Sequence, residues 1–304
     1  MIVELINTGS ELMLGRVLNT HQQWLCRRLA DLGYVVGRQV AVPDNGSDIT
    51  QAVREALARA DLVITTGGLG PTSDDLTRDL IARLLGRELH EDATVLAHIR
   101  QFFESRRRRM PEGTQIQAMV PEGAIVLTNP HGTAPGLAIE AQPNPFRAGG
   151  RPSWLIMLPG PPRELQPMFA DSAIPLLRRV LPPGENFVCR TLRTTGIGES
   201  VIQEMIAGPL RALVAAGLDL GYCARPSQVD VRLAASGAGA EQRVAEAEAL
   251  VRKLLAPHIY GVDDEEIEAV IVRLLTERKA TLAMAESCTG GCIAHRITNV
   301  PGAS

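Results

Sequence analysis

Short apolar runs alternate with stretches of helical spacing along the first 180 residues. Three runs are short enough for buried strands and cover residues 2–8, 34–42 and 61–65. The stretches that carry apolar side chains on one helical face are residues 20–32, a segment that ends at residue 60, and residues 76–85. Strand and helix in turn predict a three-layer α/β domain, with a parallel sheet covered by helices on both faces.

The pattern changes after Pro182-Pro183-Gly184, a stretch typical of a boundary. Beyond it the predicted order is strand 188–195, helix 198–207, strands 218–223 and 228–235, helix 241–255 and a short strand at 259–260. This order predicts a small α+β module with helices packed on a sheet. The last segment predicts a helix at 263–277, a strand at 281–285 and a loop, which are too few elements to close a core. We therefore expect domains at residues 1–180, 181–262 and 263–304, the last being the start of a third α/β domain that is cut off.

A glycine-rich loop joins the third predicted strand to the helix after it. Gly67, Gly68 and Gly70 let main-chain N–H groups approach a ligand closely, because no Cβ intervenes. The helix N-terminus adds a partial positive charge that favours phosphate. The loop lacks both the Gly-Lys-Ser/Thr end of a Walker A motif and the GxGxxG spacing of a dinucleotide-binding turn. It predicts phosphate binding, and the alternative is a plain helix entry capped by Ser73 or Asp74.

Acidic side chains follow the ends of three predicted parallel strands. Glu11 follows the first strand, Asp44 the second, and Asp74 and Asp75 the third. Because ligands bind outside the carboxyl ends of such strands, we expect the four carboxylates to share one crevice. Mg²⁺ takes oxygen ligands from one or two carboxylates and from phosphates, so we expect it to bridge them. Glu164, in the first turn of a later helix, is either a further ligand or a partner of the helix dipole.

Composition narrows the classes of function. The 304 residues are 45% hydrophobic and 3% aromatic with a net charge of −3, which argues against a nucleic-acid-binding protein. Five scattered cysteines indicate no disulfide framework and predict a reducing, cytoplasmic setting. The sequence shows no signal peptide and no transmembrane run, so we expect a soluble protein without membrane contact.

For three further features of the sequence, a structural role is favoured over a functional one. The Gly196-Ile197-Gly198 turn has the wrong spacing for the Gly-x-x-Gly loop of a KH domain, so a structural or dimer-forming role is favoured over nucleic-acid binding. The arginine run 106–109 is typical of a solvated helix end, and the alternative is an arginine that reaches a ligand phosphate. His90 and His131 have no second ligand at metal spacing.

Several motifs together resemble the CinA family, also called competence/damage-inducible or CinA-like proteins. The resemblance covers essentially the whole chain. It rests on NTGSEL at 7–12, NT at 19–20, VPDN at 42–45, TGGLGPTSDDLT at 66–77, NPHGTAPG at 129–136, LPGPPRE at 158–164 and AESCTGG at 285–291.

The resemblance implies three parts: a molybdopterin-binding-like first domain, a KH-type middle module and a C-terminal nicotinamide-nucleotide amidohydrolase (NMN deamidase) domain. It implies that the first domain hydrolyses the diphosphate of ADP-ribose, with Mg²⁺, to AMP and ribose 5-phosphate. Because we expect the deamidase domain to be incomplete, we expect no deamidase activity in this chain. The alternatives are a non-catalytic molybdopterin- or nucleotide-binding module and a partner-binding protein, with the middle module joining a homodimer.

The resemblance also implies roles for single residues. In molybdopterin-binding relatives the loop reads Gly-Gly-Thr-Gly and ends in a functional aspartate, which corresponds to Asp75, with Asp44 as its upstream partner; Leu69 stands in place of the threonine. Ser287 matches the serine proposed as the deamidase nucleophile. The expected catalytic residues are Asp44, Asp74, Asp75 and Ser287, and the expected metal ligands are Glu11, Asp44, Asp74 and Asp75. The expected substrate contacts are Gly9, Ser10, Asn19, Gly67, Gly68, Gly70, Thr72, Ser73, Gly132, Thr133, Gly160 and Glu164.

Overall fold

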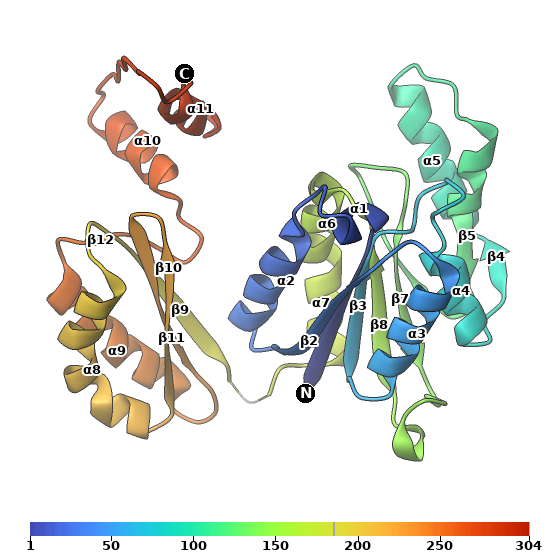
Figure 1. Cartoon of the computed structure of the whole chain (residues 1–304), viewed down its shortest axis with the longest axis horizontal. Helices are drawn as coiled ribbons and strands as arrows, with labels where there is room; N and C mark the ends of the chain where they lie inside the picture. The colour runs from blue at the N-terminus through green and yellow to red at the C-terminus, as the bar shows by residue number, and fades with distance from the viewer. Residues whose placement is uncertain (185, 304) are drawn as a thin grey trace. The chain divides into compact units, whose positions relative to one another are not determined.

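The computed structural model describes residues 1–184 and 186–303 and divides into two compact units, Met1–Pro183 and Gly184–Ser304 (Figure 1). The predicted second and third domains thus fall into one unit. None of the helices within the described residues combines the length and the apolar character that a membrane span requires.

The first unit is built on a six-stranded sheet in the order β2-β1-β3-β8-β7-β6. Its strands are β1 (Ile2–Thr8), β2 (Val35–Val42), β3 (Leu62–Thr66), β6 (Ile125–Leu127), β7 (Gly136–Ala141) and β8 (Ser153–Leu158). The first four strands in the sheet are parallel, as predicted, but β7 is antiparallel to both of its neighbours, β8 and β6. The loops between β6, β7 and β8 are short and contain no crossover helix, so these strands can pair only in antiparallel fashion. The sheet is therefore mixed rather than fully parallel.

Helices cover both faces of this sheet, as the three-layer prediction requires (Figure 1). Along β3, Val63 packs into one apolar cluster, while its neighbours Leu62 and Ile64 pack into the other. This alternation follows from the two-residue period of a strand. The helices are α1 (Ser10–Met13), α2 (Thr20–Asp31), α3 (Gly46–Leu57), α4 (Thr77–Leu84), α5 (Ala93–Ser105), α6 (Pro162–Met168) and α7 (Ile174–Val180), with the 3₁₀ helices η1 (Glu112–Ala118) and η2 (Ala148–Gly150) and the π-helical turn η3 (Phe169–Ala173). The strands β4 (Leu89–Glu91) and β5 (Met119–Pro121) form a separate antiparallel pair.

The second unit contains a four-stranded antiparallel sheet in the order β10-β11-β9-β12. Its elements are β9 (Val188–Thr195), α8 (Glu199–Ala215), β10 (Leu218–Arg225), β11 (Gln228–Ala235), α9 (Ala240–Leu255) and β12 (Ile259–Val262). Buried side chains of α8, α9 and the strands form one apolar core, as predicted for helices on a sheet. Helix α8 continues beyond the predicted end at residue 207 because Leu210 remains buried in this core.

The segment after β12 forms α10 (Ile267–Glu277) and α11 (Cys292–Thr298). The strand predicted at residues 281–285 is wrong, because these residues form neither helix nor strand in the structure. A strand needs a neighbour for its main-chain hydrogen bonds, and no described strand pairs with this segment. Arg193 of β9, which is fully buried, ties the start of α10 to the sheet through two hydrogen bonds of 3.0 and 3.2 Å to Glu266.

Candidate functional site

A pocket of about 320 Å³ lies where β3 and β8 end in the first unit. This is the edge of the sheet at which the sequence predicts ligand binding. The lining residues are Gly67, Gly68, Leu69, Gly70, Pro71, Asp75, Gln117, Thr133, Ala134, Pro159, Gly160, Pro161 and Glu164. Seven predicted site residues are therefore brought together: Gly67, Gly68, Gly70, Asp75, Thr133, Gly160 and Glu164.

The glycine-rich loop has a backbone that other residues rarely adopt. Gly67 and Gly68 have φ angles of +95° and +68°, in the region where glycine has no steric penalty. A Cβ on Gly68 would lie 2.0 Å from Oγ1 of Thr77, and one on Gly67 would lie 2.7 Å from Oγ1 of Thr8. The glycines are needed for close packing of the loop against β1 and α4, and this packing leaves the loop main chain along the pocket wall.

Asp75 closes the loop on itself. Its Oδ2 accepts hydrogen bonds from the main-chain N of Thr72 at 2.9 Å and from its hydroxyl at 2.5 Å. The same carboxylate lies over Gly70, where a Cβ would come within 2.3 Å of it. Helix α4 begins at Thr77 and has no side-chain cap, so the alternative of a helix entry capped by Ser73 or Asp74 is wrong.

Asp74 and Ser73 lie in the same turn but do not line the pocket. A hydrogen bond from Thr72 lowers the pKa of the Asp74 carboxyl, which is fully exposed. The turn thus directs Asp75 toward the pocket and leaves Asp74 in solvent.

Glu164 places a second carboxylate in the pocket wall. The residue is only 8% exposed, and its Oε2 accepts a hydrogen bond of 2.8 Å from Nδ2 of Asn129. A Cβ on Gly132 would lie 1.9 Å from the same oxygen. Gly132 therefore makes room for Glu164, while the pocket itself is lined by the next residue, Thr133.

The residues at the ends of β1 and β2 form a separate arrangement. Oδ2 of Asp44 accepts from the main-chain N of Ser10 at 2.8 Å, and Oγ of Ser10 accepts from the main-chain N of Asp44 at 3.1 Å. Glu11 folds over Gly9, where a Cβ would lie 2.6 Å from its Oε1. Asn19 caps α2 by accepting from the main chain of Gln22.

The expected four-carboxylate cluster is not formed in the described part of the chain, which contains no group of three or more His, Cys, Asp or Glu side chains placed to hold a metal ion. The physical reason is local: Asp44 binds the main-chain N–H of Ser10 in a neighbouring loop, and Asp75 binds that of Thr72 in its own loop. The roles predicted for Glu11, Asp44 and Asp74 stay predictions.

Two residues near the pocket were not predicted. Gln117 of η1 lines the pocket at 2% exposure; its Nε2 donates to the Leu69 carbonyl at 3.4 Å, and its Oε1 has no partner among the described residues. Nε2 of His21 forms a hydrogen bond with the Gly160 carbonyl, and burial lowers the pKa of His21 although this bond raises it. Nothing in the sequence around Gln117 signals its position, but His21 directly follows the NT motif at 19–20.

Ser287 lies in the second unit, on an exposed loop before α11. Its hydroxyl is 3.7 Å from the thiol of Cys288. Glu286 holds the loop by accepting hydrogen bonds from the Thr289 hydroxyl at 2.6 Å and from the main-chain N of Ile293 and Ala294 at 3.0 and 2.9 Å. These bonds lower the pKa of Glu286, so its carboxylate stabilises the conformation of the motif loop.

Three family models match the chain. The model described as "Probable molybdopterin binding domain" matches residues 4–179, the damage-inducible protein CinA KH domain matches residues 189–261, and the CinA C-terminal domain matches residues 264–304. The predicted molybdopterin-binding-like fold and the KH-type module are thereby confirmed.

Relatives and one solved structure agree with these matches. A CinA-like protein of Akkermansia muciniphila is 44% identical over 302 residues, which cover 99% of this chain and 69% of the relative. A relative from Symbiobacterium thermophilum, whose name refers to competence-damage induction, is 44% identical over 310 residues, covering 100% of this chain and 70% of the relative. The crystal structure of CinA from Thermoplasma acidophilum, whose title gives its function as unknown, matches at 32% identity with a TM-score of 0.50, covering 58% of this chain and 97% of that chain.

The comparisons contradict the function predicted from the sequence. They give no support for hydrolysis of ADP-ribose, and the names of relatives refer to competence-damage induction instead. The description of the chain as an incomplete deamidase is also wrong, because the family model of the C-terminal domain matches residues 264–304. The first family model alone covers more than half of the 304 residues, and the matched relatives align over nearly all of them. The chain therefore belongs to the CinA family.

Proposed function

We propose that the pocket of the first unit binds a small molecule that carries phosphate, of the nucleotide or pterin type, together with Mg²⁺. The observation that carries this proposal is the pocket itself, which combines the main chain of Gly67, Gly68 and Gly70 with two carboxylates at the carboxyl edge of the sheet. Free main-chain N–H groups at such loops bind phosphate oxygens. The N–H of Gly67 donates to the Leu158 carbonyl at 3.0 Å, so the donors left for phosphate are the N–H groups of Gly68 and Gly70. The match of this domain to a molybdopterin-binding family supports the same class of ligand.

The charge of the pocket supports a cation between ligand and protein. Asp75 and Glu164 line the pocket, and its lining residues include no lysine or arginine. A phosphate there would meet two negative charges without compensation. The hydrogen bonds to Asp75 use Oδ2, so Oδ1 faces no competing donor among the described residues. Mg²⁺ needs only one or two protein carboxylates when phosphate supplies further oxygens, and Asp75 would hold it.

A heterocyclic ring fits the remainder of the wall. The carboxylate of Glu164 and the amide of Gln117 are the acceptors that the amino groups of purines and pterins require. Leu69 is 3% exposed and its side chain packs in the core, so it offers its main chain to the pocket. The leucine that stands here in place of the relatives' threonine therefore does not fill the pocket.

Calorimetry with ADP and with inorganic pyrophosphate, each in MgCl₂ and in EDTA, tests this proposal on the full chain. We expect binding that depends on Mg²⁺ and that weakens about tenfold or more in Asp75→Asn, because a charge-assisted ligand is lost. Asp171→Asn removes the charge of an exposed aspartate outside the pocket and is the matched control. The proposal is wrong if neither compound binds, or if EDTA and Asp75→Asn leave the affinity unchanged.

The same proposal includes a homodimer. Four exposed apolar residues lie in one short stretch that begins at the last residue of α1: Met13, Leu14, Val17 and Leu18, of which Leu18 is 85% exposed. Contiguous exposed apolar side chains are typical of protein interfaces. Light scattering should give twice the mass of the chain, and Leu18→Asp should shift the protein toward monomer; a monomer in the unmodified chain refutes the dimer.

A further inference from the structure

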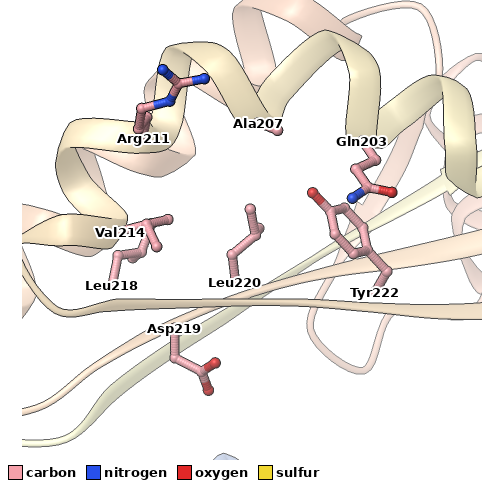
Figure 2. Close-up of a pocket in the computed structure, with 8 residues that line it drawn as sticks. All are labelled: Gln203, Ala207, Arg211, Val214, Leu218, Asp219, Leu220 and Tyr222. Carbon is pink, nitrogen blue, oxygen red and sulfur yellow. The ribbon is translucent and has the colours of Figure 1, made fainter.

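A second cavity, of about 400 Å³, lies in the second unit between helix α8 and strand β10 (Figure 2). The helix contributes residues at intervals of three and four, and the strand contributes the alternate residues Leu218, Leu220 and Tyr222 together with Asp219. The lining residues are Gln203, Ala207, Arg211 and Val214 from α8, and Leu218, Asp219, Leu220 and Tyr222 from β10. Figure 2 shows Leu220 and Tyr222 pointing from the strand toward the helix, whereas Asp219 points away from it. We refer to this cavity as the α8–β10 groove.

Strand β10 is an edge strand, and no described strand pairs with its outer side. It pairs with β11 over all eight of its residues and stands at the end of the sheet order. Alternate N–H and C=O groups of an edge strand face outward and can pair with another extended chain. Natural edge strands commonly carry proline or charged side chains that block such pairing. Strand β10, with the sequence LDLGYCAR, has no proline or lysine, and its two charged residues form ion pairs within the sheet, Asp219 with Arg232 and Arg225 with Asp230.

The groove beside this edge has an apolar floor and, within the described part of the chain, one unpaired positive charge at its border. Ala207, Val214, Leu218 and Leu220 supply aliphatic surface. Asp219 is already bound by Arg232 at 2.7 Å, whereas Arg211 is exposed and has no ion-pair partner among the described residues. The charge left uncompensated at the groove is therefore that of Arg211.

At the other end of the groove, the hydroxyl group of Tyr222 lacks a hydrogen-bond partner among the described residues. This hydroxyl is enclosed, and Figure 2 shows it directed toward the side chain of Gln203. Burial raises the pKa of Tyr222, with a smaller contribution from Glu199, so the hydroxyl keeps its proton. A ligand that displaces Gln203 would find a hydrogen-bond donor here.

We propose that the α8–β10 groove binds an extended peptide segment of a partner protein, which pairs with β10 as an added strand. One apolar side chain of the peptide lies on the aliphatic floor, and a carboxylate, from an acidic residue or a C-terminus, binds Arg211. This is recognition by strand addition, in which main-chain bonds give affinity and alternate side chains give specificity. A nucleic acid fits less well, because the groove offers a single arginine and no stacking platform for bases apart from Tyr222.

The test uses a set of fluorescein-labelled hexapeptides in which Val, Leu or Phe alternates with Ser or Thr before a C-terminal Asp. Fluorescence anisotropy with the full chain should show binding for members of the set. Arg211→Glu should weaken the binding about tenfold or more, because the carboxylate loses its charged donor. Ala207→Trp fills the groove and should weaken it similarly, while Lys253→Glu, an equal charge change on the exposed surface of α9, should leave it unchanged.

Two controls separate this mode from other contacts. Peptides with N-methylated main chains keep their side chains but cannot donate to β10, and they should bind at least about tenfold more weakly. A short oligouridylate tests the nucleic-acid alternative. The proposal is overturned if no peptide of the set binds up to about 1 mM, if Arg211→Glu and Ala207→Trp have no more effect than Lys253→Glu, or if the oligouridylate binds in preference to the peptides.

Discussion

Gly68→Ala tests the packing of the loop that forms the pocket wall. The new Cβ would lie 2.0 Å from Oγ1 and 2.9 Å from Cβ of Thr77, a residue with no exposed surface. Forcing a left-handed φ of +68° on alanine costs about 1–2 kcal/mol. Relieving the overlap with a buried neighbour costs about 1–3 kcal/mol more. We therefore expect the free energy of unfolding of the first unit to fall by roughly 2–5 kcal/mol.

Gly86→Ala is the matched control. Gly86 follows α4 with a φ of +63°, and a Cβ there would have nothing within 4 Å. It should therefore lose only the conformational cost of about 1–2 kcal/mol. The double variant Gly68→Ala/Thr77→Ala removes the nearest atom of the overlap and should recover part of the loss.

Urea unfolding followed by tryptophan fluorescence measures these differences. Both tryptophans, Trp24 and Trp154, lie in the first unit, so the signal reports its unfolding separately from the second unit. The reasoning is refuted if Gly68→Ala and Gly86→Ala lose equal stability within about 0.5 kcal/mol. It is also refuted if removal of the Thr77 hydroxyl brings no recovery.

Three further predictions concern stability. Arg193→Ala should lower the free energy of unfolding of the second unit by about 3 kcal/mol, because Glu266 and Asp230 lose a fully buried partner. Arg193→Met keeps the packing and should lower this free energy clearly less. Equal decreases for the two variants, measured by hydrogen exchange, would contradict this prediction. Gly132→Ala should lower the stability of the first unit by about 1–3 kcal/mol, since its Cβ would overlap Glu164; an unchanged fluorescence transition would show that Glu164 moves freely. Burial lowers the pKa of His21 below its ordinary value of 6.5, so the unfolded chain binds the proton more tightly than the folded chain. The contribution of His21 to stability therefore falls as the pH drops below 6.5 and is unaffected above it. His21→Gln should reduce the decrease in Tm between about pH 7.5 and 5.5, and an undiminished decrease would contradict this assignment.

Hydrophobic periodicity was sufficient for most of the fold. The three strands and helices of the first part and the strands of the middle module have strong local patterns, and each lies close to its predicted bounds. The reversed direction of β7 was missed, because direction depends on the short loops between the strands rather than on the strands themselves. The predicted strand at 281–285 failed because an apolar run becomes a strand only beside another strand.

The candidate site was predictable only in part. The topology predicts Asp75 and the loop glycines at the carboxyl edge of the sheet, and the pocket lies there; that Glu164 joins them from a distant helix did not follow from topology. Sequence could not show that Asp44 turns to the main chain of Ser10, since that depends on the paths of two loops. Gln117 reaches the pocket from a 3₁₀ helix that has no periodic signature.

The most direct test of the central claim is a crystal structure of the chain with ADP and MgCl₂. Our account predicts the diphosphate against the main chain of residues 67–70, with Mg²⁺ in contact with Asp75 and the ring near Glu164. Electron density for ADP elsewhere on the chain, or a pocket that remains without ADP at saturating concentration, would contradict it.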